Sequence, residues 1–365
     1  MTPSTPETSL GEDRLSTPPF AVPEKTPPPS DAEAETTKRG FGVNELVNAI
    51  GPLIGLAVVF AFFSILRPST FPNWNNVQNI LIETAVVGTA ALGMTMIIVS
   101  GGIDLSVGSS IALCTVSVAT LLNWGVNHHL SPALTTLIAV VGGIGTGALC
   151  GLLISTLITR LQLSPFIVTL GMWGALRGVA KGLANEQTVQ APDTWLNSLL
   201  NSLRPDQKWM IFPPGVWMLL FMAILVALML RYTRFGRHIF AIGSNENTAR
   251  LCGVPVDRAK IGLYTLAAAF VGIAGILQFS YLTIGDPTTA DGMELDIIAA
   301  VVIGGASLTG GQGSIFGSLI GAFIIRMVAN GCVKLELSNW VQQIVTGVII
   351  VFAVTLDRWR HRRAT

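Results

Sequence analysis

The chain has 365 residues, of which 50% are hydrophobic and only 12% are charged, with a formal net charge of +1. Its mean hydropathy is +0.60. Because soluble domains carry about 25% charged residues, this composition excludes an ordinary soluble globular protein and predicts one that crosses a membrane many times. The small net charge gives no reason to expect a nucleic acid or an acidic substrate as a partner.

The first part of the chain, residues 1–44, is predicted to form a disordered, proline-rich cytoplasmic tail. It includes Pro27, Pro28 and Pro29 but almost no large apolar side chains. Such a segment cannot bury enough apolar surface to offset the conformational entropy that folding removes. It also lacks the basic start and short apolar core of a cleaved signal peptide, so we expect the first apolar run to serve as the insertion signal.

Ten apolar runs follow the tail, and most approach the roughly 20 residues that a transmembrane helix needs. They predict an all-α membrane protein with about ten transmembrane helices. Four runs are short or interrupted by glycine, so some of the ten are expected to be broken or re-entrant. The runs are residues 47–66, 80–100, 105–123, 133–159, 163–180, 215–231, 260–281, 294–309, 313–331 and 340–357, and the short ones are the third, fifth, eighth and ninth.

Lysine and arginine are concentrated in three places, and this distribution orients the predicted spans. One pair, Lys38 and Arg39, precedes the first run. Six basic residues lie from Arg231 to Lys260, and four arginines lie in the C-terminal segment 358–365. Because positive charge favours the cytoplasmic side, all three groups are expected there. Ten crossings are consistent with this and place both termini in the cytoplasm.

A glycine-rich break lies between the second and third apolar runs, and in it Gly101 and Gly102 precede Asp104. A carboxylate inside a bilayer is costly, so this segment is expected to do more than anchor the chain. Asp104 is predicted to hold the start of the next helix by accepting N–H bonds from Ser106 or Val107. Direct contact with a substrate is the alternative.

A second, similar arrangement is expected around the eighth run. Glu294 and Asp296 stand at its start, where helix capping or interfacial solvation is the favoured interpretation and substrate contact the alternative. Gly304 and Gly305 echo the first glycine pair weakly, as two halves built on a similar plan would. Gating or structural roles are therefore predicted for both sets of residues, namely Gly101, Gly102 and Asp104, and Glu294, Asp296, Gly304 and Gly305.

Glu83 and Arg326 lie inside apolar runs, where an unpaired charge is costly. Glu83 is expected near the outer interface, and Arg326 is expected to face protein, the cytoplasmic interface or a carboxylate. Two runs contain glycines four residues apart, which is typical of close helix packing. These glycines are Gly143, Gly147 and Gly151, and Gly313, Gly317 and Gly321.

The segment 232–259 is too polar for the bilayer and is predicted to form a cytoplasmic loop that contains a short helix. Ser244 or Asn245 can cap this helix, and Glu246 suits its positive first turn. The glycine and proline of residues 253–255 stop it after about two turns. An ordinary interfacial helix and a docking site for a cytoplasmic partner both fit this pattern.

No motif of catalysis is present in the sequence. It has no Walker motif, no Ser/His/Asp or Cys/His constellation and no metal-ligand cluster, so neither an enzyme, a cofactor nor a metal is expected. The four cysteines are isolated and are interpreted as packing residues. His128 and His129 are interpreted as a polar interfacial pair.

Three stretches together resemble the inner-membrane permease of ribose-type ATP-binding-cassette sugar importers, of the binding-protein-dependent transport system permease family. They are GGIDLSVGS at 101–109, AIGSNENTARLCGV at 241–254 and ELDIIAAVVIGGASLTGGQGSIFGSLIGA at 294–322. The resemblance runs in order from about residue 45 to residue 357. It implies a transmembrane permease domain at 45–357, a coupling loop at 232–259 within it, and a basic cytoplasmic C-terminus at 358–365.

The same resemblance implies partners and a role for the short helix. The chain is expected to form a homodimer in the lipid of the bacterial inner membrane, with cytoplasmic ATPase subunits and a periplasmic sugar-binding protein. Glu246, Ala249 and Gly253 would form the core of the coupling helix that docks on the ATPase. Thr248 stands where the family commonly has a second alanine, and a threonine is small enough to fit there.

The resemblance therefore implies a permease subunit that forms the pathway for a ribose-like monosaccharide or polyol, driven by ATP hydrolysis on a separate subunit. Two alternatives remain open at this point. One is a permease for branched-chain amino acids. The other is a self-contained, proton-coupled secondary transporter in which Asp104 or Glu294 carries the proton.

Overall fold

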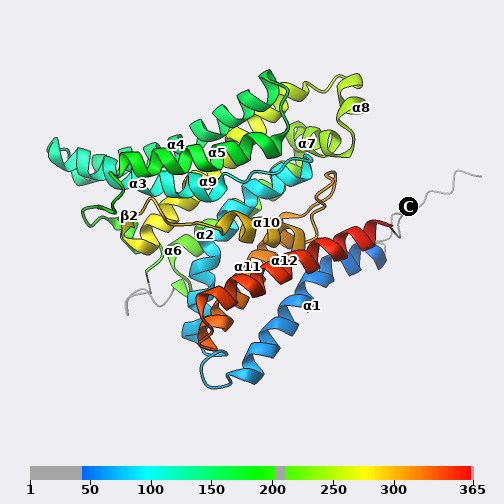
Figure 1. Cartoon of the computed structure of the whole chain (residues 1–365), viewed down its shortest axis with the longest axis horizontal. Helices are drawn as coiled ribbons and strands as arrows, with labels where there is room; N and C mark the ends of the chain where they lie inside the picture. The colour runs from blue at the N-terminus through cyan, green and yellow to red at the C-terminus, as the bar shows by residue number, and fades with distance from the viewer. Residues whose placement is uncertain (1–42, 202–209, 363–365) are drawn as a thin grey trace, which may run out of the picture. The chain divides into compact units, whose positions relative to one another are not determined.

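The computed structural model describes residues 43–201 and 210–362, and these ranges are built almost entirely from helices (Figure 1). Most of the predicted tail, residues 1–42, and the end of the basic C-terminus, residues 363–365, lie outside the described residues. The helices are α1 (Val43–Leu66), α2 (Trp74–Val99), α3 (Val107–Asn127), α4 (Pro132–Arg160), α5 (Pro165–Leu183), α6 (Pro214–Tyr232), α7 (Arg234–Ser244), α8 (Glu246–Leu251), α9 (Val256–Leu282), α10 (Met293–Ile303), α11 (Ile315–Lys334) and α12 (Asn339–Arg362).

Each of the ten apolar runs overlaps one of these helices. In the described ranges, six helices are long and apolar enough to cross a membrane, namely α2, α3, α4, α6, α9 and α11. The chain is therefore a multi-pass, all-α membrane protein. The helix expected at 294–309 is shorter than predicted, because α10 ends at Ile303. Its 11 residues span only about 16 Å, about half the hydrocarbon thickness of a bilayer.

The centre of the bundle is α2, which packs against α6, α9, α10 and α11 (Figure 1). Of the residues in its most apolar stretch, 94% are buried, as expected for a helix that is apolar around its whole circumference. Small residues such as Ala85, Ala90 and Ala91 contribute to this core and let the neighbouring helices approach closely. The rest of the fold is arranged around this helix.

Glycines bring two pairs of helices into backbone contact, as their spacing predicts. On α4, Gly143, Gly147 and Gly151 face α9, and a side chain at Gly147 or Gly151 would overlap the α9 backbone. On α11, Gly317 and Gly321 face the backbone of α10 in the same way. The prediction of close helix packing is confirmed for Gly143, Gly147, Gly151, Gly317 and Gly321, whereas Gly313 lies in the loop before α11, against Val99 and Ala306.

The helices α1 and α12 both pack on α11 and share one apolar cluster with it. Phe63 of α1 and Phe71 of the following turn stack at 5.2 Å between ring centroids. The opposite side of α1 exposes large apolar residues, including Ile65, which is 79% exposed. An apolar exposed side of this kind is suited to contact with lipid.

A small β-structure interrupts the all-α pattern. The strands β1 (Val189–Gln190) and β2 (Ile284–Gly285) pair in antiparallel fashion, with Val189 opposite Gly285. A short 3-10 helix, η2 (Trp195–Ser198), follows β1. Figure 1 shows β2 at one end of the bundle and α7 and α8 at the other, and these are called below the β2 end and the α8 end.

Candidate functional site

The short helix that the sequence predicts is present as α8, and local capping explains its length. The side chain of Asn245 accepts a hydrogen bond from the backbone N–H of Thr248 at 2.9 Å. Glu246 occupies the positive first turn. Gly253 has a φ of +84°, a left-handed conformation that ends helices and suits glycine. The helix therefore begins at Glu246 and ends at Leu251.

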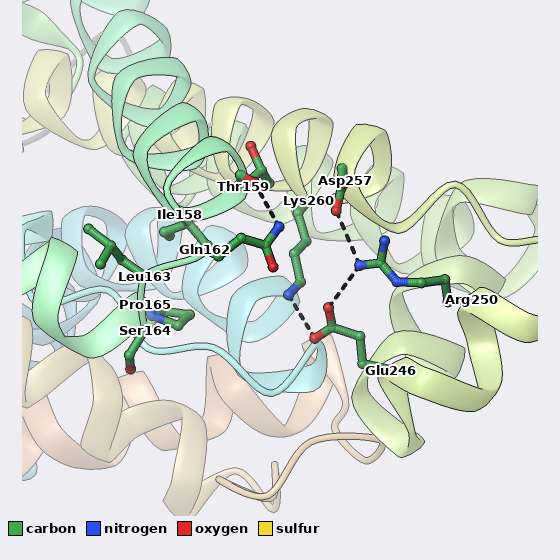
Figure 2. A pocket seen from close by; sticks show the side chains of 10 residues that line it. All are labelled: Ile158, Thr159, Gln162, Leu163, Ser164, Pro165, Glu246, Arg250, Asp257 and Lys260. Carbon is green, nitrogen blue, oxygen red and sulfur yellow. Dashed lines mark hydrogen bonds and ion pairs between the residues drawn. The ribbon is translucent and has the colours of Figure 1, made fainter.

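The carboxylate of Glu246 ties α8 to the start of α9 (Figure 2). One of its oxygens accepts a hydrogen bond from the Lys260 ammonium at 2.7 Å, and the other lies 3.5 Å from the Arg250 guanidinium. Arg250 also pairs with Asp257 at 3.3 Å. Two acids and two bases thus neutralise one another across the turn between the helices. Glu246 is turned toward its own subunit.

These four charged side chains form one wall of a polar pocket of about 250 Å³. Its other wall is the end of α4 and the link to α5, residues 158–165 (Figure 2). Within that wall Gln162 donates a hydrogen bond to the carbonyl oxygen of Thr159 at 3.1 Å. The pocket separates α8 from the α4–α5 link, so α8 is held on one side by α9 and is open on the other.

The helix α8 has an inner and an outer side that differ in burial. Ala249 is only 5% exposed and packs with Ile242, Val256 and Ala259. Leu251, by contrast, is 88% exposed at the end of the helix. The helix thus buries its small apolar residue against its own subunit and leaves its large one uncovered.

The outer side of α8 is defined here by three side chains, Asn247, Thr248 and Leu251. All three are exposed, whereas Glu246 is half-buried and Ala249 is buried. Of the three residues expected to form the core of a coupling helix, Glu246 and Ala249 thus face the chain itself. Gly253 is exposed and shapes the turn that follows.

Immediately beside α8, three distant segments meet through their backbones. The end of α2, the end of α7 and the loop after α10 contribute Gly101, Gly243, Gly310 and Gly311, which we call the glycine junction. The N–H of Gly311 donates a hydrogen bond to the carbonyl oxygen of Val99 at 2.8 Å.

At two positions of the glycine junction the neighbouring backbone leaves no room for a side chain. A Cβ atom on Gly243 would overlap the carbonyl oxygen of Val99, and one on Gly310 would lie 3.0 Å from the Cα atom of Gly101. Gly101, Gly310 and Gly311 also have φ angles of +83°, +89° and +76°, which side chains disfavour. Space therefore requires glycine at Gly243, backbone conformation requires it at Gly101 and Gly311, and both require it at Gly310.

Asp104 makes the hydrogen bond to the backbone N–H of Ser106 that the sequence predicts, and this bond holds the turn directly before α3. Its Oδ1 atom accepts hydrogen bonds from the backbone N–H of Ser106 at 2.8 Å and from the Ser106 hydroxyl at 2.6 Å. The helix begins at Val107, two residues later than the sequence suggests, because this turn occupies the intervening residues. Nearby, Gly102 lies against the buried hydroxyl of Tyr264.

Glu294 and Asp296 both lie in the first turn of α10, but they face different neighbours. Glu294 is buried beside Gly108 of α3, and its Oε2 atom has no hydrogen-bond partner among the described residues. Asp296 forms an ion pair with Arg326 of α11. The carboxylate partner that the sequence left unidentified for Arg326 is therefore Asp296.

The second glycine pair ends α10 and brings it against α11. Gly305 has a φ of +92°, and Gly304 packs directly on the backbone of Gly317. The loop that follows returns to Gly101 in the glycine junction. The structure thus joins the two glycine-rich breaks, whereas Glu294 and Asp296 lie at the other end of α10.

Two contacts of this region have no local signal in the sequence. Lys260 is separated from Glu246 by a turn, and only the structure shows that they meet. At the β2 end, Arg177 of α5 donates hydrogen bonds to the carbonyl oxygens of Pro287 and Thr289 at 3.1 and 2.6 Å. This arginine fastens the loop between β2 and α10 to α5.

The described residues contain no group of three or more histidine, cysteine or acidic side chains that could hold a metal ion. His128 stacks on Trp124, with 4.5 Å between ring centroids. Cys114, Cys150 and Cys332 are buried as free thiols, and Cys252 is an exposed one.

Comparison with known proteins gives one family and several close relatives. The family model described as "Branched-chain amino acid transport system / permease component" matches residues 76–354. The ribose import permease protein RbsC of Escherichia coli strain K12 is 38% identical over 305 residues, which are 84% of this chain and 92% of that protein. RbsC of Bacillus subtilis strain 168 is 37% identical over 328 residues, 89% and 98% of the two chains.

A third relative carries a different sugar in its name. The L-arabinose ABC transporter permease protein AraH of Azospirillum brasilense is 31% identical over 341 residues, 93% of this chain and 96% of that protein. No solved structure matches the chain.

Proposed function

The chain belongs to the branched-chain amino acid transport system / permease component family, and from this premise we propose that it is the membrane-spanning subunit of an ATP-driven sugar importer. The expected resemblance to ribose-type permeases is confirmed by relatives named for ribose and L-arabinose at 31–38% identity. These names, together with the three sequence motifs, are the observation that carries the proposed cargo, a monosaccharide or a polyol.

The energy for transport comes from a separate cytoplasmic ATPase that docks on α8. The exposed Leu251 supports this step, since burying an exposed leucine side chain against a partner is favourable by about 1.5–3 kcal/mol. Asn247 and Thr248 complete the docking surface. Glu246 and Ala249 hold the helix on α9, and Gly253 sets its end, so these three position the coupling helix.

Movement of α8 is transmitted along two routes. The Glu246–Lys260 ion pair connects α8 to α9, which packs along α4 and α2. The glycine junction connects the end of α7 to α2 and to the loop between α10 and α11. Closure of the ATPase then shifts these helices between inward-open and outward-open arrangements. The sugar changes the balance between the two arrangements only as far as it binds one more tightly than the other.

The remaining features follow the sequence-based expectations. The permease domain comprises 45–357, with the coupling loop 232–259 and the basic segment 358–365 in the cytoplasm. Both termini, the tail 1–44 included, lie there as well. The chain works as a homodimer in the bacterial inner membrane, and a periplasmic binding protein delivers the sugar to the β2 end. Gly101, Gly102, Asp104, Glu294, Asp296, Gly304 and Gly305 have structural or gating roles.

Uptake by the purified complex tests this function. The chain is reconstituted into proteoliposomes with the ATPase and the binding protein whose genes adjoin its own, and uptake of radiolabelled D-ribose is measured with and without ATP. L-arabinose, D-xylose, D-fructose and L-leucine are tested in parallel. We expect ATP-dependent uptake of at least one of the sugars and none of leucine.

Two results contradict the proposal in different ways. ATP-dependent uptake of leucine, with none of the four sugars, assigns the chain to branched-chain amino acid import, the cargo in the family's description. Sugar uptake driven by a pH gradient in liposomes that contain the chain alone shows a secondary transporter, with Asp104 or Glu294 as the candidate proton carriers.

A further inference from the structure

The segment that joins β2 to α10, residues 286–292, runs beside α3 for much of the length of that helix, and we call it the β2–α10 loop. Just before the loop, Gly285 lies against α3, where a Cβ atom on Gly285 would come within 2.7 Å of the Cβ atom of Ala119. Near the end of the loop, a Cβ atom on Gly108 of α3 would overlap the carbonyl oxygen of Ala290. The loop therefore follows α3 from Ala119 to Gly108, about 16 Å along the helix.

This course takes the β2–α10 loop deep into the membrane. The helix α3 is long and apolar enough to cross a membrane. Trp124, near its end, is placed at the membrane surface, where tryptophan is enriched. Ala119 lies five positions before Trp124 and Gly108 lies 16 before it, so the loop descends from about 8 Å to about 24 Å below that surface. Since the hydrocarbon core is about 30 Å thick, this non-helical segment passes the middle of the bilayer.

Non-helical backbone at that depth is tolerated where it is buried in protein or lines a water-filled cavity. One side of the β2–α10 loop is held by protein. Arg177 of α5 donates hydrogen bonds to two carbonyl oxygens of the loop, and Gln278 of α9 donates one to the hydroxyl of Thr289 at 2.8 Å. The hydroxyl of Thr115 of α3 donates a hydrogen bond to the carbonyl oxygen of Asp286 at 3.3 Å. Three helices thus fix this side.

The other side of the loop is polar and uncovered. Within the part of the chain that the structure describes, Thr288, Asp291 and Gly292 are all exposed. The side chain of Asp291 is 72% exposed, although it lies 3.8 Å from the Arg177 guanidinium. Contact of a carboxylate with hydrocarbon is costly, so this side of the loop faces a wet or polar surrounding and not lipid. A route for a polar solute through the membrane supplies such a surrounding.

A sugar suits the exposed side of the loop. Its hydroxyls donate hydrogen bonds to a carboxylate such as that of Asp291, and they both donate to and accept from a hydroxyl such as that of Thr288. Neither contact requires a net charge on the cargo. Gly292 has no side chain, so a sugar ring can approach the backbone beside it.

We propose that the β2–α10 loop lines the route of the sugar through the membrane, and that Thr288 and Asp291 bind its hydroxyl groups. This rests on the proposed function, under which the cargo is a sugar. Binding here is weak, because a site on a transport path must release what it binds.

The position of the loop also connects the sugar to the docking surface. The helix α10 begins directly after the loop, at Met293. The segment that follows α10 leads to Gly310, which lies against Gly101 in the glycine junction. One short helix thus joins the sugar's contacts to the junction beside α8.

Thiol labelling in the full reconstituted complex tests whether the loop faces water. Thr288→Cys and Asp291→Cys are each made in a chain that also contains Cys252→Ser, because Cys252 is exposed and the other three cysteines are buried. Phe221→Cys is the lipid-facing control, since Phe221 is 61% exposed on the apolar helix α6. A permanently charged methanethiosulfonate reagent does not enter hydrocarbon, so it should modify positions 288 and 291 about tenfold faster than position 221, or more.

Protection by the sugar tests whether this route is that of the cargo. The labelling is repeated during ATP-driven turnover, with binding protein that carries D-ribose and with binding protein that carries none. L-arabinose, D-xylose or D-fructose replaces D-ribose if the unaltered complex takes up that sugar instead. The sugar should slow labelling at positions 288 and 291 several-fold. Trp195→Cys is the control, because Trp195 is 57% exposed in η2, outside the loop, and its labelling should be the same with and without sugar.

The variant Asp291→Asn tests the carboxylate itself. It removes a charged acceptor for the sugar's hydroxyls and should lower uptake about tenfold, as the loss of one hydrogen bond to a charged group predicts. The Tm should not change, because the side chain is mostly exposed. Glu336→Gln is the matched control, since Glu336 is an 84% exposed acid that also lies 3.8 Å from an arginine, and its uptake should equal that of the unaltered chain.

The outcomes separate this site from the function as a whole. If positions 288 and 291 react no faster than position 221, the loop does not line a water-filled route, and the proposal is wrong whatever the cargo. If the complex transports a sugar that neither protects these positions nor depends on Asp291, the route of the sugar lies elsewhere. If the unaltered complex takes up none of the four sugars, the proposed function fails and the assignment of a sugar to this loop fails with it, while the labelling rates still decide whether the loop lines a route.

Discussion

Replacement of Leu251 by alanine tests whether the outer side of α8 is the docking surface. The side chain is 88% exposed, so the change removes almost no packing from the permease itself, and its Tm should not change. Alanine lacks three carbon atoms of leucine, and at about 0.8 kcal/mol for each buried CH₂ their burial against the ATPase contributes about 2 kcal/mol. This loss corresponds to roughly 30-fold weaker binding.

Binding of the purified ATPase to permease in lipid nanodiscs measures this effect, with the Tm of the permease recorded on the same samples. Leu149→Ala is the matched control, because Leu149 is 66% exposed on the apolar side of α4 and should leave binding unchanged. Ala249→Leu provides the contrast. Since Ala249 is only 5% exposed, the larger side chain should destabilise the α8–α9 contact by about 1–3 kcal/mol.

Two results would refute the reasoning. Unchanged affinity of the ATPase for Leu251→Ala would show that the partner does not cover this side chain. A clear fall in the Tm of the isolated permease would show that Leu251 packs against its own subunit, so that its exposure is not that of a docking residue.

Three further changes probe the elements that connect α8 to the bundle. Gly243→Ala places a methyl group against the backbone of α2, where overpacking costs about 1–3 kcal/mol, and this variant should show ATP-driven uptake reduced about tenfold or more. Gly145→Ala is the control, because a methyl group there has open space, and it should transport normally. Equal uptake by the two variants would exclude the glycine junction from transmission. Glu246→Gln should change the free energy of unfolding by at most about 1 kcal/mol, because the ion pair of Glu246 with Lys260 is partly exposed. ATP hydrolysis should nevertheless continue with little sugar uptake. Normal uptake per ATP hydrolysed in this variant would contradict the role given to the ion pair. Gly151→Ala should lower the Tm of the permease, since a side chain there overlaps the backbone of α9, and an unaltered Tm would show that the two helices are not held in close contact.

The features that the sequence predicts best are those with local causes. Asn245 and Gly253 delimit α8 through a side-chain cap and a left-handed backbone, both of which depend on residues within a few positions. The apolar runs likewise predict the helices because each run is continuous. The helix α10 is shorter than its run because Gly305 turns the chain before the apolar residues end.

Contacts between distant segments are not predictable in this way. Asp296 and Arg326 are 30 positions apart. The sequence identifies Arg326 as a charge in need of a partner and Asp296 as a capping or interfacial residue, but it does not identify them as partners of one another. The glycine junction joins segments more than 200 positions apart, Gly101 and Gly310 among them. The sequence shows these glycines, but only the fold shows which backbone takes the place of the missing side chain.

The composition of the glycine junction has a consequence for how such a permease diverges from its relatives. A joint made of main chain alone offers no side chain that could distinguish one ATPase from another, and any side chain added at Gly243 disturbs it. Under the proposed function, selectivity for the ATPase is left to a few exposed positions on α8. Grafting those positions from a second importer should redirect the chain to that importer's ATPase, with the membrane bundle and its cargo unchanged.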